Sequence, residues 1–290
     1  MTIEKVHART LERRSANISV VIPAHNEAAT IANVIEAARA GLRHMDTPGE
    51  VIVSASGCTD STAEVAHECG AEVIIAPIGK GAAIKEGVKK ANGDIVCLVD
   101  GDLDYYGAVP LVALLVEPLL QGIADATIAD LYWRPIYPDQ WLHAFFAPVA
   151  GHLFPELLPK AGSTPWSGQR SATRELWPES LPDNFTADLA LVLHWNEHAE
   201  RLRPVLADDW FNPLRPKPEL LAMDYELLAT NAVERGRLLP AARPRLDAWF
   251  RAVQDLVDGY DPQQHDPREY ERRALNASIT ELRTRLGHLA

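Results

Sequence analysis

The sequence predicts an α/β fold: a mostly parallel β-sheet flanked by helices, followed by a helical extension at the C-terminus. Two observations predict the sheet. Short apolar runs rich in β-branched residues, typical of strands buried on both faces, alternate with segments whose apolar residues recur at helical spacing. The connections between them are short, as in βαβ units with right-handed crossovers. A third observation predicts the helical extension: after about residue 133 the sequence becomes Pro-rich and then helical in pattern.

Residues 1–135 carry the alternation and form the first predicted part of the chain. The predicted strands are 18–23, 50–55, 71–76, 94–100 and one within 125–133. The predicted helices between them are 27–41, 61–70, 79–93 and 109–122. Ser61 stands where an N-cap is favoured, and Gly41 and Gly70 stand where C-caps are common, so the helix ends agree with the periodicity.

The remaining sequence is predicted as two further parts. Residues 136–218 contain Pro-rich and aromatic loops; the elements predicted there are a helix at 186–202 and a strand near 203–209. Residues 219–290 are predicted to be entirely helical, with helices at 219–236, 243–259 and 267–287. Their amphipathic pattern predicts that they pack on the domain or form a subunit contact.

The composition limits the classes of partner. The 290-residue chain has 40 acidic and 28 basic residues and a formal net charge of -12, which disfavours nucleic acid and anionic lipid. No apolar signal segment begins the sequence, and the most apolar stretch, 107–124, is interrupted by Pro110, Glu117 and Pro118, so no membrane span is expected. The three cysteines lack paired spacing, which favours a cytoplasmic protein.

Small and polar residues follow each of the first four predicted strands. The segments are PAHNE, SASGCTDST, GKG and DGDLD. Because ligands of open α/β sheets bind outside the carboxyl ends of the strands, we expect these segments to form one site. Asp100, Asp102 and Asp104 suit a divalent cation shared with a phosphorylated ligand, the alternative being a solvated acidic turn. Lys80 at a helix start suggests an anion site, and Asp60 is expected to cap the second helix.

Four segments together carry a family resemblance. They are ISVVIPAHNEAATIANVI, SGCTDST, GKGAAIKEGV and GDIVCLVDGDLD. Over residues 17–135 the chain resembles the nucleotide-sugar glycosyltransferases of GT-A fold, family 2 and its relatives, and among them the glucosyl-3-phosphoglycerate synthases. The resemblance implies a nucleoside diphosphate sugar as donor, favouring UDP, and Mg²⁺ or Mn²⁺ as cofactor.

The resemblance also implies the donor-side residues. These are Pro23, Ala24, His25, Glu27, Ser56, Lys80, Asp100 and Asp102. The first four would line the nucleoside pocket, with Glu27 bonding the ribose or the base. Ser56 would contact the base or the ribose, and Lys80 would lie by the base. Asp100 and Asp102 match the DXD motif: Asp100 would hold the ribose, and Asp102 the metal that bridges the diphosphate. Asp104 would contact the metal or cap the next helix.

On the acceptor side the resemblance is carried by shorter segments. Ser167, Gly168 and Gln169 stand at the position of the family's S-G-E segment, and Asp188 would be a general base or would orient the acceptor. Arg134 would meet an anionic group of either substrate. Two departures concern the acceptor and the metal. Gln169 replaces a glutamate, and the stretch 208–220 lacks the family's histidine metal ligand, leaving Asp208 or Asp209 as candidates.

The predicted function is therefore a metal-dependent glycosyltransferase of the hexosyltransferase class. It would move a sugar from a nucleoside diphosphate to a small soluble acceptor, with retention of the anomeric configuration favoured by the resemblance, as is a homodimer. Two alternatives stay open at this point: a sugar-phosphate nucleotidyltransferase, and a nucleotide-sugar-binding protein without catalysis. Motifs of serine hydrolases and of dinucleotide oxidoreductases, G-x-S-x-G and G-x-G-x-x-G, are absent from the expected positions.

Overall fold

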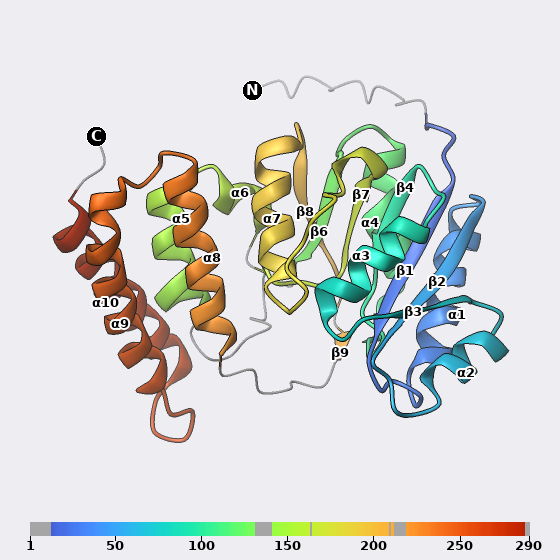
Figure 1. Cartoon of the computed structure of the whole chain (residues 1–290), viewed down its shortest axis with the longest axis horizontal. Coiled ribbons are helices and arrows are strands. Elements are labelled where there is room, and N and C mark those ends of the chain that lie inside the picture. The colour runs from blue at the N-terminus through green and yellow to red at the C-terminus, as the bar shows by residue number, and fades with distance from the viewer. Residues whose placement is uncertain (1–12, 131–140, 163, 209, 212–218, 288–290) are drawn as a thin grey trace, which may run out of the picture.

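The computed structural model describes residues 13–130, 141–162, 164–208, 210–211 and 219–287. Figure 1 shows an α/β body, with a group of helices that includes the C-terminal ones to its left. The body contains a seven-stranded sheet with the strand order β3-β2-β1-β4-β7-β6-β8. This arrangement confirms the predicted mostly parallel sheet flanked by helices.

The sheet brings four of the predicted strands side by side. Their bounds are β1 (Ile18–Ala24), β2 (Gly49–Ser56), β3 (Glu72–Ala76) and β4 (Ile95–Leu98). These four strands run parallel, with Ile18 of β1 opposite Gly49 of β2 and Ile95 of β4. Their carboxyl ends therefore meet at one edge.

Three further strands complete the sheet. They are β6 (Ala126–Asp130), β7 (Arg170–Thr173) and β8 (Leu202–Leu206). β7 was not predicted, and it runs antiparallel to both of its neighbours, β4 and β6. It has only four residues and begins with a buried arginine and serine, so it lacks the apolar run that marks a strand. A separate two-stranded sheet pairs β5 (Asp104–Tyr105) with β9 (Trp210–Phe211).

Helices cover both faces of the sheet. Their bounds are α1 (Ile31–His44), α2 (Thr62–Glu68), α3 (Lys80–Lys90), α4 (Leu111–Leu120) and α7 (Ala187–His198). Alternate residues of β1 serve the two faces, as the period of a strand requires. Val20 packs into one core with residues of α1 and α4, and Val21 packs into another with residues of α3 and α7.

Residues 141–176 contain short helices where the sequence predicted loops. They are a π-helix (Trp141–Phe146), α5 (Ala147–Leu153), α6 (Leu157–Ala161) and a 3₁₀ turn (Arg174–Leu176). Pro148 lies just after the π-helix passes into α5, inside one continuous helical run from Trp141 to Leu153. Proline at this position therefore does not end the helical run.

The C-terminal extension is helical, as predicted. It contains α8 (Leu220–Glu234), a 3₁₀ turn (Pro240–Ala242), α9 (Arg243–Asp258) and α10 (Pro267–Leu286). Its apolar residues share one core with the π-helix, α5 and α6; Phe145, Leu228 and Trp249 are all fully buried there. Among the described residues, every helix is too short or too polar to cross a bilayer.

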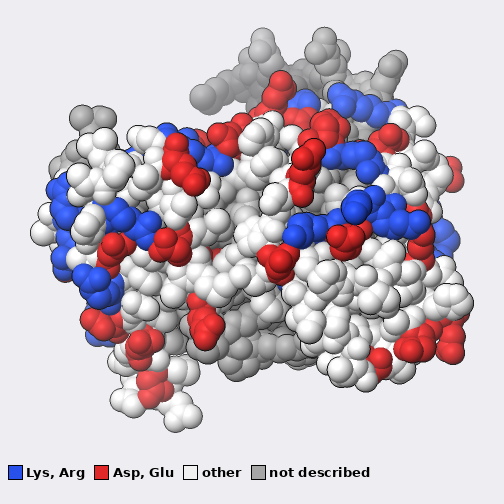
Figure 2. All heavy atoms as spheres, in the orientation of Figure 1, with Lys and Arg blue, Asp and Glu red and all other residues white. Residues whose placement is uncertain are grey.

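The face seen in Figure 2 carries acidic and basic side chains interspersed with each other. Elsewhere in the described residues, surface charges form local ion pairs, such as Lys90 with Glu72 at 2.7 Å and Arg235 with Glu197 at 2.6 Å. Exposed pairs of this kind contribute little to stability. The charges that matter for the site lie in the interior instead.

Candidate active site

One cavity lies at the carboxyl ends of the first strands and at the start of α3. It measures about 270 Å³ and is lined from all four of the polar segments singled out in the sequence. All the donor-side residues predicted above lie in its wall: Pro23, Ala24, His25, Glu27, Ser56, Lys80, Asp100 and Asp102. The fold thus brings together one set of residues at the sheet edge where ligands of α/β proteins bind.

The loops after β1 and β2 are tied to each other. Asn26 has a backbone φ of 58°, and its side-chain oxygen accepts a hydrogen bond from the Thr59 N–H at 2.7 Å. The Asp60 carboxylate accepts from the N–H groups of Ala28, at 3.1 Å, and of Thr62, at 3.0 Å. A hydrogen bond from the Thr62 hydroxyl is the main cause that lowers the pKa of Asp60. Asp60 therefore binds the first turn of α2, as expected, and also fixes the cavity wall.

The ends of β1, β2 and β3 are joined by a second set of hydrogen bonds. His25 Nδ1 lies 2.6 Å from the Ser56 carbonyl oxygen. The Ser56 hydroxyl donates to the Pro77 carbonyl at 2.7 Å and accepts from the Gly79 N–H at 2.9 Å. Ser56 is therefore a structural connection between two strand ends as well as part of the cavity wall.

The start of α3 is occupied by another segment of the protein. The Ala82 N–H donates to the Asp183 carbonyl at 3.1 Å. A Cβ at Gly81 would lie 1.7 Å from the Pro182 carbonyl oxygen, so this close approach requires glycine. One amide of the helix start, that of Ala82, thus donates to the chain itself, and the anion site expected at Lys80 stays a prediction.

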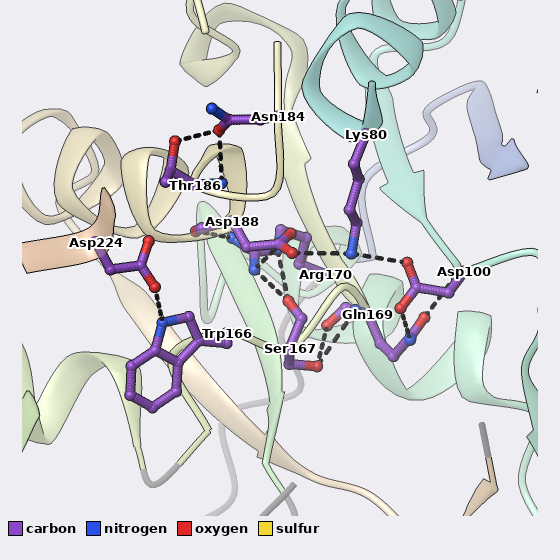
Figure 3. A network of polar contacts seen from close by, with 10 residues as sticks. All are labelled: Lys80, Asp100, Trp166, Ser167, Gln169, Arg170, Asn184, Thr186, Asp188 and Asp224. Carbon is purple, nitrogen blue, oxygen red and sulfur yellow. Dashed lines mark hydrogen bonds and ion pairs between the residues drawn. The ribbon is translucent and has the colours of Figure 1, made fainter. Parts of the chain in front are cut away.

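Lys80 lies between two carboxylates (Figure 3). Its Nζ is 3.0 Å from Asp100 Oδ1 and 2.8 Å from Asp188 Oδ2. The three side chains are 13%, 17% and 6% exposed, respectively. The positive charge beside Asp100 is therefore a lysine from the preceding helix, and it links Asp100, predicted to serve the donor, to Asp188, predicted to serve the acceptor.

Arg170 holds Asp188 from the other side. Its guanidinium is fully buried, with Nη2 3.3 Å from Asp188 Oδ1 and Nη1 donating to the Asp188 carbonyl at 2.8 Å. Burial lowers the pKa of Arg170, and the charges of Asp188 and Asp100 act in the opposite direction. The Asp188 carboxylate thus lies against two cations, Lys80 and Arg170.

The segment Ser167–Gln169 contacts Asp100 from the side of β7. The Gln169 side chain accepts a hydrogen bond from the Asp100 N–H at 2.9 Å and donates one to Asp100 Oδ2 at 2.7 Å. The Ser167 hydroxyl accepts from the Gln169 N–H at 3.2 Å, and both side chains are 1% exposed. Among the described residues, none of this segment lines the cavity, so its contacts are with Asp100 and Arg170.

The other acidic residues near the motif have different surroundings. Asp102 lines the cavity, whereas Asp104 is exposed in β5 and accepts from the Tyr106 hydroxyl at 2.9 Å. Asp104 does not cap the next helix, because α4 begins only at Leu111. Asp208 accepts from the Tyr105 hydroxyl at 3.5 Å. Two predicted residues, Arg134 and Asp209, lie outside the described residues.

The structure adds residues that sequence reasoning missed. Ile78 and Phe185 line the cavity with exposed apolar surface, and single apolar residues in loops give no sequence signal. Asp224 of α8 is fully buried and accepts from Trp166 Nε1 at 2.8 Å. Burial is the main cause that raises the pKa of Asp224 to about 8. The helical extension thus places a carboxylate next to the residue that precedes Ser167.

Similar proteins were found at the levels of sequence and structure. Glucosyl-3-phosphoglycerate synthase of Mycobacterium tuberculosis is 32% identical over 237 residues, which cover 73% of this chain and 72% of the relative. A hexosyltransferase of low-salt glycan biosynthesis in Haloferax volcanii is 33% identical over 171 residues, or 55% of this chain and 39% of the relative.

Solved structures of the Mycobacterium tuberculosis synthase share the fold. Its complex with Mn²⁺, uridine diphosphate and glucosyl-3-phosphoglycerate has a TM-score of 0.61 and 31% identity, covering 77% of this chain and 80% of the other. A complex with Mn²⁺, UDP-glucose and phosphoglyceric acid has a TM-score of 0.59 at 29% identity, covering 81% of this chain and 84% of the other. These matches confirm the predicted GT-A fold.

The family profile described as "Glycosyl transferase family 2" matches residues 19–177. This range runs from β1 through β7. It contains all the residues of the cavity wall except Phe185, and it also contains the segment Ser167–Gln169. It covers more than half of the chain, and the curated relatives include proteins named as a hexosyltransferase and as a glycosyltransferase. The predicted enzyme class is therefore confirmed: the chain belongs to glycosyl transferase family 2.

Proposed function

We propose that this enzyme transfers a sugar from a UDP-sugar to a small soluble acceptor, with Mg²⁺ or Mn²⁺ as its cofactor. The observation that carries the proposal is the cavity at the strand ends, whose wall contains every predicted donor-side residue. Support also comes from the synthase structures that contain uridine diphosphate together with Mn²⁺ or Mg²⁺. Membership of the family argues against the two alternatives, nucleotidyltransferase and binding protein.

The nucleoside would occupy the part of the cavity formed by β1, β2 and the start of α3. His25 and Ser56 are held there by the hydrogen bonds that join the strand ends, and Ile78 adds apolar surface for a base. Asp100 would accept hydrogen bonds from the ribose hydroxyls, and Glu27 would contact the ribose or the base. The pocket needs little rearrangement to bind, since its wall is cross-linked by hydrogen bonds.

The donor set of the cavity fits a hard divalent cation. Asp102 offers carboxylate oxygens in the cavity wall, and Mg²⁺ commonly binds through one or two carboxylates together with substrate phosphates. No group of three or more His, Cys, Asp or Glu among the described residues is arranged to hold a metal alone, which favours an ion shared with the diphosphate. Such an ion offsets the negative charge that develops on the leaving nucleoside diphosphate.

On the acceptor side, Asp188 is proposed to orient groups at the reacting centre rather than to act as a base. The support is its position between Lys80 and Arg170, which leaves its charge paired. Lys80 spans the donor and acceptor carboxylates and would keep their spacing fixed during transfer. Ser167, Gly168 and Gln169 would then act through Asp100 and Arg170, and Arg134 would meet an anionic group of a substrate.

Retention of the anomeric configuration, a homodimer and a cytoplasmic location complete the proposal. They rest on the resemblance to the glucosyl-3-phosphoglycerate synthases, and the unpaired cysteines agree with a reducing compartment. The anomeric proton coupling of the product in NMR tests retention, and an inverted product would contradict it. The mass from light scattering tests the homodimer, and a monomer would contradict it.

The direct test incubates the protein with a panel of nucleoside diphosphate sugars and small acceptors, with Mn²⁺, with Mg²⁺ and with EDTA. Turnover or binding of a UDP-sugar that depends on the metal is expected. Asp102→Ala should reduce turnover at least a hundredfold, because the charge on the leaving group is no longer offset. If no sugar nucleotide binds or reacts, or if Asp102→Ala keeps full activity, the proposal is wrong in its donor or in its metal ligand.

A further inference from the structure

Gln169 makes two hydrogen bonds to a single residue of the cavity wall. The Asp100 N–H donates to its side-chain oxygen at 2.9 Å, and its amide nitrogen donates to Asp100 Oδ2 at 2.7 Å (Figure 3). One amide therefore binds both the backbone and the carboxylate of Asp100. Because Gln169 is 1% exposed, water has little access to replace these bonds if they are lost.

Two other contacts restrict the same carboxylate. Lys80 Nζ lies 3.0 Å from Oδ1 of Asp100, the oxygen that Gln169 leaves open. A Cβ at Gly168 would lie 2.3 Å from Oδ2, so the carboxylate rests against a backbone position that has no side chain. Gln169, Lys80 and Gly168 therefore contact the Asp100 carboxylate from three directions and restrict its orientation.

Residue 169 adds no charge to this group of side chains. Among the described residues, Asp100 lies against Lys80, and Asp188 lies against both Lys80 and Arg170. An amide at position 169 adds hydrogen bonds without adding a charge. A glutamate at position 169 would add a third carboxylate facing Asp100 and would remove the N–H donor, which is costly in a buried site.

We propose that Gln169 is a positioning residue that holds Asp100 in the orientation that recognises the ribose hydroxyls of the donor nucleotide. Gln169 directly precedes β7, so the position of this strand would help to determine the preference for ribonucleotides. The proposal rests on the proposed function, because it takes Asp100 as the ribose ligand. It assigns to Gln169 a donor-side role, although its segment was expected to serve the acceptor.

The test measures binding of UDP and of 2′,3′-dideoxy-UDP by calorimetry in the presence of Mn²⁺. Wild type is expected to prefer UDP by about tenfold or more, the usual value of a hydrogen bond to a charged group. Gln169→Met keeps the length of the side chain and removes both hydrogen bonds. It should lower the preference to about threefold or less, while the affinity for the dideoxy nucleotide stays close to that of wild type.

Two further variants complete the design. Gln169→Glu should lose at least as much of the preference as Gln169→Met, and it serves as the second variant if Gln169→Met does not fold. Gln121→Glu is the matched control, since Gln121 also donates to a carboxylate, that of Glu117 at 3.5 Å, but lies at the end of α4. It should bind both nucleotides as wild type does. Circular dichroism and thermal melting establish that each variant is folded.

The outcomes separate the two proposals. A folded Gln169 variant that keeps the full preference for UDP overturns the positioning role. So does an equal loss of affinity for both nucleotides, because a merely structural role would weaken both alike. Wild type that binds neither nucleotide removes the proposed function, and with it the role of Gln169.

Discussion

At the scale of single residues, the site depends on buried charges that neutralise each other. Lys80 is the central one, because it contacts both Asp100 and Asp188. Removing one member of a buried ion pair leaves an uncompensated charge in a medium of low polarity. The chain offers a surface pair for comparison, Lys85 with Asp183 at 2.5 Å, whose carboxylate side is 68% exposed.

Lys80→Met is expected to destabilise the protein by about 3–5 kcal/mol, because two largely buried carboxylates lose their shared cation. UDP binding should weaken at the same time, since Asp100 loses one of its restraints. Urea unfolding and calorimetry measure the two effects. Lys85→Met is the control and should cost about 1 kcal/mol or less. Equal losses for both lysines would contradict the central role of Lys80.

Asp224 gives a prediction about pH. Burial raises the pKa of its carboxyl to about 8 in the folded protein, well above the usual value of about 4 in an unfolded chain. The folded state therefore holds a proton that the unfolded state releases, and this contribution to stability is lost as pH rises from about 4 to about 8.

Asp224→Asn keeps an acceptor for Trp166 and has no proton to lose. Relative to wild type, its free energy of unfolding should rise by several kcal/mol between about pH 4 and pH 8, at about 1.4 kcal/mol per pKa unit. Urea unfolding at a series of pH values tests this, with the exposed Asp258→Asn as control. A difference between variant and wild type that does not change with pH would contradict it.

At the scale of elements, the position of the cavity wall depends on close contacts between helices and loops. The start of α3 lies against residues 182–183, and the same loop carries Phe185 into the cavity wall. The contact is possible because Gly81 has no side chain. Nothing in the local sequence of the helix indicates which segment of the chain it meets.

Gly81→Ala is expected to displace this loop, because the added Cβ would lie 1.7 Å from the Pro182 carbonyl oxygen. The cost should be about 1–3 kcal/mol, as for other overpacked sites, despite the better helix propensity of alanine. UDP binding should weaken as Phe185 moves. Gly151→Ala in α5 is the control, since its Cβ would meet only Leu158 Cδ1 at 3.3 Å. If Gly81→Ala melts and binds like wild type, the contact does not position the loop.

At the scale of the whole molecule, the C-terminal extension is part of the enzyme's core. Trp249 of α9 is fully buried, stacks with Phe145 at 6.3 Å between ring centroids, and donates to the Ser278 carbonyl at 3.1 Å. Asp224 of the same extension binds Trp166, next to the segment Ser167–Gln169. The extension is therefore connected to the site by a short chain of contacts.

Trp249→Ala should destabilise the whole protein by about 3–5 kcal/mol, because it leaves a large cavity in a core shared by the extension and residues 141–166. Since the core is continuous, the loss should appear as a single shifted transition when unfolding is followed by both circular dichroism and UDP binding. Binding that persists after the extension has unfolded would show that the two parts are independent.

The alternation of strands and helices could be predicted because it depends on local patterns. The apolar run before Pro23, the glycines after the helices and the polar strand ends are all visible within a few residues. That the four polar strand ends lie together could also be predicted, since the carboxyl ends of parallel strands meet at one edge. The predicted boundaries between the three parts of the chain stay predictions.

The sequence by itself determined the alternation of strands and helices, the edge at which the polar strand ends meet, and the resemblance to the family. Only the tertiary structure decided which charged side chains pair with each other in the site. It inserted β7 between β4 and β6, enclosed Arg170 and Gln169 beside the motif, and set Lys80 between Asp100 and Asp188. The physical reason is that these contacts join residues far apart in the chain, and the burial that makes them strong exists only after the chain has folded.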